Sequence, residues 1–191
     1  IPASQLAGWL TEPHLQAARI RRPMPEKRSI SATRGSAFHR YVENYFYRAS
    51  LGPLPGLDPE YEAGFEEIRD LISSFEASEF AIMKPVAVEQ ELALPIAGHI
   101  LVCKIDAVFQ DAETIHIVDW KTGEAPKGLS EVATKSIQLA AYRAAWSRWK
   151  DVNEKLVKAS FWFAGSGTLF TPSELPGATE LERRLREISM A

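Results

Sequence analysis

Two side chains near the end of one short segment have the types and spacing to act together. Counting every second residue from Ile115 gives one set of side chains, and Asp119 and Lys121 are neighbouring members of that set. A β-strand directs alternate side chains to the same face, so Asp119 and Lys121 would emerge side by side. A carboxylate and an amine on a rigid strand can anchor a metal ion and orient a water. The simpler alternative is a surface Asp and Lys on an edge strand.

Other polar side chains occur where a helix or a strand would hold them. His39 and Glu43 are four residues apart in a helical pattern and would share a helix face. Asp106 interrupts an apolar strand pattern, where an Asp is disfavoured unless it has a partner or a task. Gln138 and Tyr142 are one helical turn apart and could both point along a groove. The alternatives are a solvated His–Glu pair and the polar edge of a packed helix.

The elements that must position these side chains follow from hydrophobic periodicity and turn residues. Period-two stretches predict strands at 86–94 and 100–109, joined by a turn at 95–99, then strands at 115–121, 156–164 and 168–171. Apolar stripes predict helices at 33–49, 59–76, 131–150 and 180–188, with a shorter one at 4–10 and a connector at 21–33. In the second strand, alternation places Asp106 and Lys104 on one face and four apolar residues on the other: Cys103, Ile105, Ala107 and Phe109.

Composition limits the class of protein. The 191 residues suit one domain with a helical appendage, and no apolar run approaches the 18 residues of a membrane span. The start, without Met or a signal-peptide pattern, reads as a piece cut from a longer chain. The single cysteine, Cys103, excludes a disulfide framework and any four-cysteine zinc or iron–sulfur site. A net charge of −3 argues against a free-standing nucleic-acid binder.

The order of these groups along the chain resembles the RecB-type branch of the PD-(D/E)XK nuclease superfamily. The resemblance covers roughly residues 33–170 and rests on four motifs: Gly35-Ser-Ala-Phe-His39-Arg-Tyr-Val-Glu43, Cys103-Lys-Ile-Asp106, Asp119-Trp-Lys121 and Gln138-Leu-Ala-Ala-Tyr142. Residues 22–25 and the tail after 170 look most like the nuclease module of actinobacterial UvrD-type helicase–nucleases, the AdnB-like subunits.

The resemblance implies a role for each matching residue. His39, Asp106 and Asp119 would bind Mg²⁺ or Mn²⁺, with the backbone carbonyl of Trp120 as a further ligand. Lys121 would orient the attacking water and stabilise charge on the phosphate. Two more site residues, Gln138 and Tyr142, would position the DNA backbone or support the metal ligands. Glu43 and Glu89 are weaker candidates for supporting partners. Iron–sulfur variants of the family need four cysteines, so no such cluster is expected here.

The resemblance also implies a fold, a function and partners. The fold would be α/β of restriction-endonuclease type, a central mixed sheet flanked by helices, with a nuclease core at 33–175 between an N-terminal helix and connector at 1–32 and a C-terminal helix at 176–191. The function would be metal-dependent DNA hydrolysis, as an exonuclease module of a helicase–nuclease in double-strand-break repair. Helicase domains of the same chain or of a partner subunit would feed it single-stranded DNA in the bacterial cytoplasm, with no membrane involved. No phosphate-binding loop of the type Gly-x-x-x-x-Gly-Lys-[Ser/Thr] occurs, so ATP would bind only a parent helicase outside these residues.

Two other functions fit the same residues. The fold could be a non-catalytic module that grips DNA or a helicase, or it could be a metallohydrolase that acts on something other than DNA. The candidate phosphate contacts are few, namely Arg34, Arg40, Lys121, Lys135 and Arg143. With a net negative charge, the isolated domain is therefore expected to bind DNA weakly and with a strong salt dependence.

Overall fold

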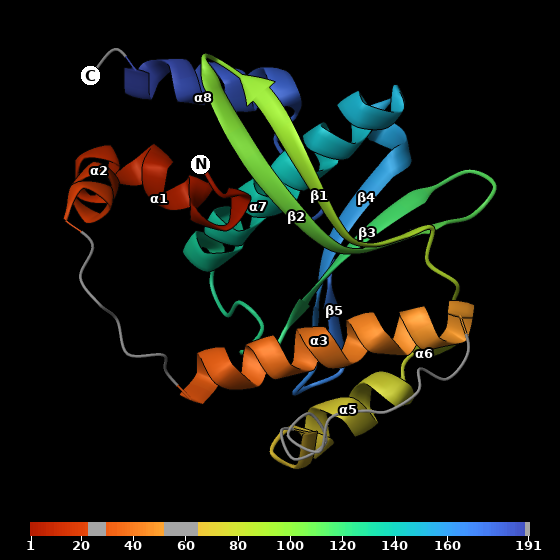
Figure 1. The fold of residues 1–191 in the computed structure, drawn as a ribbon. Coiled ribbons are helices and arrows are strands. Elements are labelled where there is room, and N and C mark those ends of the chain that lie inside the picture. Colours follow the sequence, from red (N-terminus) through yellow and green to blue (C-terminus); the bar gives the residue numbers. More distant parts are fainter. Residues whose placement is uncertain (23–29, 52–64, 190–191) are drawn as a thin grey trace.

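A mixed β-sheet of five strands forms the centre of the molecule (Figure 1). The computed structural model describes residues 1–22, 30–51 and 65–189. In spatial order the strands are β1 (Ala87–Ile96), β2 (His99–Gln110), β3 (Ile115–Lys121), β4 (Val157–Phe163) and β5 (Thr168–Phe170). Neighbouring strands are antiparallel except β3 and β4, which are parallel. The expected α/β fold of restriction-endonuclease type, a mixed sheet flanked by helices, is confirmed.

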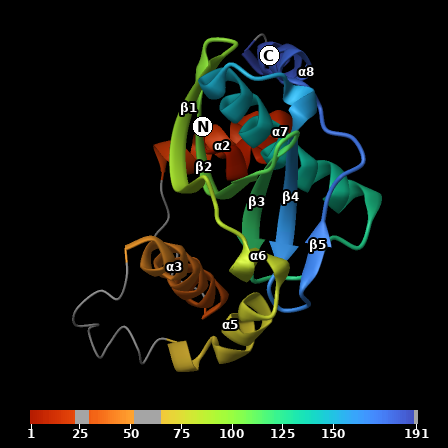
Figure 2. The ribbon, with the colours of Figure 1, turned by 90° about the vertical axis from the view of Figure 1, so that its right-hand side faces the viewer.

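One face of the sheet is covered mainly by α7 (Leu129–Lys150), the helix that crosses over between β3 and β4. Its buried residues pack on the sheet, and α1 (Leu6–Thr11) and α8 (Ala178–Ser189) pack against it in turn (Figure 2). The shared interior, here called the α7-side core, includes Leu6, Ile117, Leu139, Phe161 and Leu185. The neighbouring α2 (Pro13–Arg21) was not predicted, because it buries no residue and so carries no apolar stripe.

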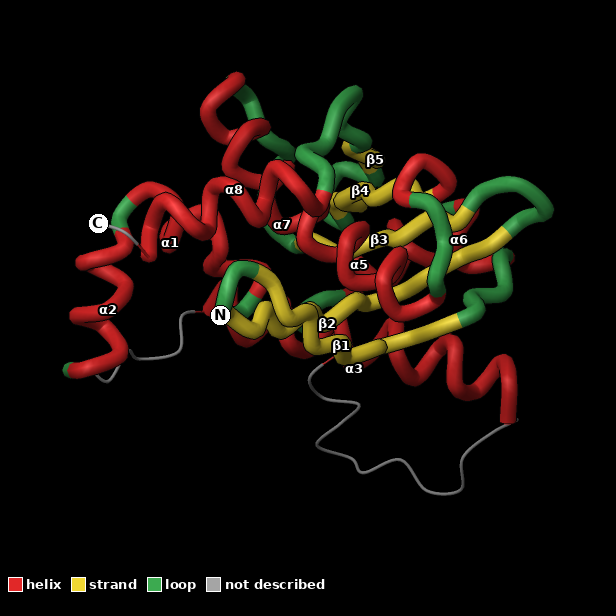
Figure 3. The backbone as a smooth tube through the Cα atoms, turned by 90° about the horizontal axis from the view of Figure 1, so that it is seen from above, coloured by secondary structure: helices red, strands yellow, loops and turns green. Residues whose placement is uncertain are grey.

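The opposite face is covered by α3 (Ile30–Leu51), α5 (Arg69–Glu76) and the single turn α6 (Glu79–Ile82). Their interior, here called the α3-side core, is largely aromatic: Phe38, Phe46, Phe75, Phe80, Trp120 and Trp162. The helix predicted from residue 59 has its first part outside the described residues, and α5 is its described end. Seen from above, α1, α2, α7 and α8 lie together on one side, and α3, α5 and α6 lie with the strands on the other (Figure 3).

The hairpin of β1 and β2 turns more tightly than predicted. Only Ala97 and Gly98 form its loop, with positive φ angles of 49° and 78°. Two-residue hairpin loops favour such left-handed backbone because its twist matches that of the strands. Gly98 adopts this conformation without a steric cost, since it lacks a Cβ. Both strands therefore continue into the predicted 95–99 turn, and Pro95 lies within β1.

Asp106 lies where β2 changes the face to which its side chains point. Cys103 and Ile105 belong to the α7-side core, whereas Ala107 and Phe109 belong to the α3-side core. The prediction that these four residues share one face was therefore wrong. Across the hairpin the register pairs residues 88 and 90 of β1 with 107 and 105 of β2, but it omits the pair between them, Glu89 and Asp106. Glu89 has a φ of 50°, so the ladder is distorted at this pair.

The N-terminal segment is attached to the same body. Ala3 and Leu6 are buried in the α7-side core, and the amine of Ile1 donates to the carbonyl of Ile100 at 2.8 Å. The division into segments 1–32, 33–175 and 176–191 stays a prediction. None of the helices in the described ranges is long and apolar enough to cross a membrane.

Candidate metal centre and active site

Asp106 is buried where α3, β2 and β3 meet. Its carboxylate accepts a hydrogen bond from the backbone N–H of Trp120 at 2.8 Å and lies 3.3 Å from Nδ1 of His39. The switch of side-chain direction next to Asp106 turns it toward α3, and the regular turns of α3 bring His39 to it. Two residues predicted as metal ligands, 67 positions apart in sequence, are thus in contact.

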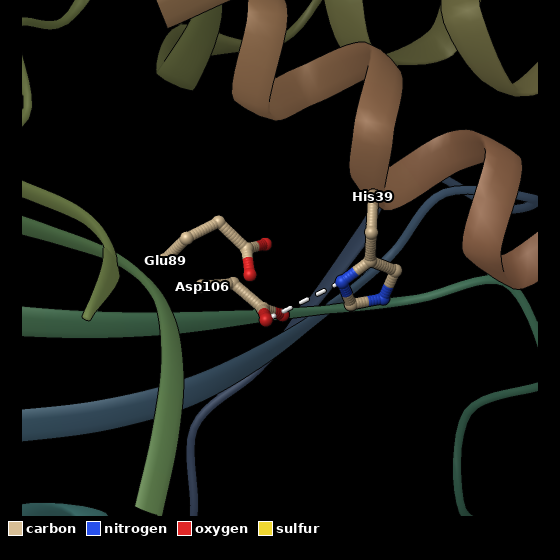
Figure 4. A group of neighbouring side chains, drawn as sticks. All are labelled: His39, Glu89 and Asp106. Carbon is tan, nitrogen blue, oxygen red and sulfur yellow. Dashed lines mark ion pairs between the residues drawn. The ribbon is translucent and has the colours of Figure 1, made fainter. Parts of the chain in front are cut away.

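Glu89 completes a group of three potential ligands (Figure 4). One ligand atom from each of His39, Glu89 and Asp106 lies within 4.8 Å of the other two. The sequence offered Glu89 only as a weaker supporting residue, because nothing in Val-Glu-Gln-Glu-Leu distinguishes Glu89 from Glu91. The left-handed backbone of Glu89 makes the difference, and strained backbone of this kind is often found at functional sites. Lys104 pairs with Glu89 from its exposed side at 2.5 Å.

Asp119 and Lys121 lie side by side, as the strand period predicted. Nζ of Lys121 is 2.5 Å from Oδ2 of Asp119, and Oδ1 accepts a hydrogen bond from Nε2 of Gln138 at 3.1 Å. Gln138 also donates to the hydroxyl of Tyr142 at 2.7 Å. The one-turn spacing on α7 therefore serves to hold Asp119. Gln138 reaches Asp119 of β3 from α7, whereas His39 reaches Asp106 of β2 from α3.

The electrostatics of the site show a surplus of buried negative charge. Burial raises the pKa of the Asp119 carboxyl, and the charge of Asp106 raises it further. Burial also raises the pKa of Glu89, although Lys104 opposes this. For His39, burial lowers the pKa, but Asp106, Asp119 and Glu89 together raise it more, to about 9. The carboxylates thus repel one another, and His39 supplies positive charge to offset them.

The residues fit a divalent cation. Carboxylate oxygens with one imidazole suit Mg²⁺ or Mn²⁺. The buried atoms Glu89 Oε2 and Asp119 Oδ2 each lie 2.5 Å from a lysine ammonium, so positive charge already lies next to both carboxylates. Asp119 and the carbonyl of Trp120 as ligands stay predictions, since the three residues grouped within ligand distance are His39, Glu89 and Asp106.

The outer side of this group opens into a hollow of about 420 Å³. His39, Glu89 and Lys104 line it, together with Arg40 and Glu43 of α3. Glu43 thus borders the site, one helical turn beyond His39. A larger hollow of about 1200 Å³ lies between the hairpin turn and the end of α7, and none of the predicted catalytic or metal-binding residues lines it.

Two of the predicted phosphate contacts have structural partners instead. Arg143 donates to the carbonyls of Leu175 and Pro176 and lies 3.6 Å from Glu154, so it ties the segment before α8 to α7. Arg34 donates to both carboxylate oxygens of Asp70 at 3.1 Å. In both arginines these contacts are made by one of the terminal nitrogens of the guanidinium.

Comparison with known proteins gives a family match and matches to solved structures. A family model described as the PD-(D/E)XK nuclease superfamily matches residues 9–188. The crystal structure of a protein from Eubacterium rectale, described as a candidate exonuclease, aligns with a TM-score of 0.58 at 15% identity, covering 99% of this chain and 77% of that one. The crystal structure of SSO0001 aligns with a TM-score of 0.41 at 18% identity, covering 97% of this chain and 84% of that one. No curated protein matches the chain.

Proposed function

Because this chain belongs to the PD-(D/E)XK nuclease superfamily, we propose that it hydrolyses DNA phosphodiester bonds with a divalent cation, Mg²⁺ or Mn²⁺. The observation that carries the proposal is the His39–Glu89–Asp106 group beside the Asp119–Lys121 pair at the end of β3. A structural ion pair alone would not need two more acidic groups and an imidazole around it. A bound divalent cation supplies positive charge at the phosphate and makes water more acidic.

The protein residues would bind the cation, orient the attacking water and position the ligands. His39, Glu89 and Asp106 would hold the cation, with Asp119 as a further ligand. The ammonium of Lys121 would orient the attacking water and stabilise the negative charge that develops on the phosphate. Gln138 and Tyr142 fix the orientation of Asp119. Burial and the charge of Asp119 raise the pKa of Tyr142, so its phenol stays protonated and can donate a hydrogen bond.

The proposal includes a role as an exonuclease module in a larger helicase–nuclease for double-strand-break repair. Its support is the sequence resemblance together with the charge of the chain. The chain has a net charge of −3, and Arg34 and Arg143 are engaged in contacts within it, so the domain alone would bind DNA weakly. A motor that threads a single strand into the site would hold the DNA in place. That motor would bind the ATP and would work on DNA in the bacterial cytoplasm.

The test is Mn²⁺-dependent degradation of linear DNA by the chain and two variants. Asp119→Asn keeps the size of the side chain and an acceptor for Gln138 but removes its charge, so cleavage should fall by at least about 100-fold. Lys121→Gln should lower cleavage to a similar extent and leave Mn²⁺ binding intact, because an ammonium is not a metal ligand.

Two exposed residues supply matched controls. Glu113→Gln and Lys158→Gln make the same charge changes at the opposite end of the sheet and should leave cleavage unchanged. Full cleavage by Asp119→Asn would contradict the proposed site. Binding of DNA and Mn²⁺ without any cleavage would favour the non-catalytic module instead.

A further inference from the structure

Lys135 is a cation that the site described so far does not use. It lies on α7, three residues before Gln138, and its side chain is partly buried. Its Nζ lies 5.8 Å from the ring centroid of Phe161 and 5.6 Å from that of Phe163. Nζ of Lys121 lies 4.9 Å from the same Phe161 ring. One ring of β4 therefore brings together two ammonium groups, one from β3 and one from α7.

Lys135 differs from the other predicted phosphate contacts in how it is held. Lys121 is paired with Asp119, and Arg34 and Arg143 are engaged elsewhere. No described carboxylate lies within ion-pair distance of Lys135. Glu131, four residues earlier on α7, accepts instead from the backbone N–H of Lys127. An ammonium held over aromatic rings keeps its charge and its three donors for an anion.

We propose that Lys135 binds a second phosphate of the substrate strand, next to the phosphate that Lys121 contacts. The inference rests on the proposed function and adds a requirement on the length of the substrate strand. The site would take a strand with at least one phosphate beyond the scissile one, on the α7 side of the sheet. Lys135 is then a positioning residue, since it touches a neighbouring phosphate rather than the reacting atoms.

The first measurement is binding, which does not depend on cleavage. Affinity for a labelled single-stranded oligonucleotide is measured by fluorescence anisotropy in EDTA over a range of salt. Lys135→Gln should weaken binding about 5- to 10-fold and should reduce the slope of log K against log salt by about 0.7, the value for one lost contact to a single strand. Lys135→Arg should restore most of the affinity, because it keeps the charge. Lys158→Gln removes an equal charge at the far end of β4 and should change neither quantity.

The second measurement compares two substrates that differ in phosphate number. With Mn²⁺, Lys135→Gln should raise KM for DNA about 5- to 10-fold at unchanged kcat. It should leave cleavage of bis(p-nitrophenyl) phosphate unchanged, because that ester has a single phosphate.

The outcomes separate this inference from the proposed function. If Lys135→Gln lowers only the melting temperature and leaves affinity and salt slope intact, Lys135 merely packs on the rings and the inference is wrong. If the unmodified chain cleaves neither substrate, the nuclease proposal fails, and the binding data still decide the role of Lys135. An equal loss on both substrates would also overturn the inference, since it would place Lys135 at the scissile phosphate.

Discussion

Glu89 shows how one residue can join a site through its backbone. Its left-handed φ of 50° lies opposite Asp106, where the hairpin ladder omits one pair. An L-residue in this region carries a steric cost of roughly 1–2 kcal/mol. A carboxylate oxygen of Glu89 lies within 4.8 Å of ligand atoms of His39 and Asp106, so the strained residue is part of the proposed metal centre. This coincidence supports a functional reason for the conformation.

Removal of the Glu89 charge should therefore weaken metal binding without unfolding the protein. Mn²⁺ should raise the melting temperature of the chain, because a ligand that binds only the folded state stabilises it. In Glu89→Gln we expect about tenfold weaker binding, which lowers that stabilisation by about 1.4 kcal/mol at saturating metal. Thermal denaturation with and without Mn²⁺ measures the effect. Glu91→Gln, two residues along β1, is the control and should keep the full Mn²⁺ shift.

At the scale of elements, α3 carries His39 and is held on the sheet by aromatic packing. Phe75 of α5 is fully buried, with ring centroids 5.2 Å from Tyr45, 5.8 Å from Phe46 and 5.7 Å from Trp120. It therefore joins α5, α3 and β3 in one cluster. Trp120 lies between Asp119 and Lys121, so this cluster also fixes the strand that carries the proposed catalytic pair.

Phe75→Ala should test that role of the aromatic cluster. Loss of a buried aromatic side chain costs about 3–5 kcal/mol, and here it would also loosen α3 beneath His39. Chemical denaturation measures the stability, and Mn²⁺-dependent cleavage measures the site. Tyr47→Ala removes an aromatic from α3 at a 45% exposed position and should change stability by less than about 0.5 kcal/mol. Equal effects of the two substitutions would contradict the proposed role of the cluster.

At the scale of the whole molecule, the distribution of charge limits the affinity for DNA. The chain has a net charge of −3, and two of the five predicted phosphate contacts are committed to Asp70 and to the segment before α8. We therefore expect weak binding by the isolated chain and a salt slope clearly smaller in magnitude than the value of about 3.5 that five contacts with a single strand would give. This slope is shallower than the sequence alone suggested.

Titration of a labelled oligonucleotide at several salt concentrations tests this expectation. A duplex of equal length serves as the comparison, since a site fed by a helicase should not prefer duplex DNA. Tight binding at physiological salt by residues 1–191 alone would contradict the dependence on a separate motor.

Local sequence pattern determined most of the elements and the partners that lie close in sequence. Period two placed Asp119 beside Lys121, and the helical period placed Gln138 beside Tyr142, because both periods follow from backbone geometry alone. The family resemblance added the pairing of His39 with Asp106, which no periodicity gives. The spatial order of the five strands is simply their order along the chain.

Only the tertiary structure decided which carboxylate completes the proposed metal-binding group and which predicted phosphate contacts have structural partners. The distortion at Glu89 and Asp106 depends on the packing of β2 between two helical layers, so strict alternation failed for Ala107 and Phe109. Arg143 and Lys135 look alike in sequence, yet one is tied to backbone carbonyls and the other lies over Phe161. Such differences arise from contacts between segments far apart in the chain, and one-dimensional patterns carry no information on them.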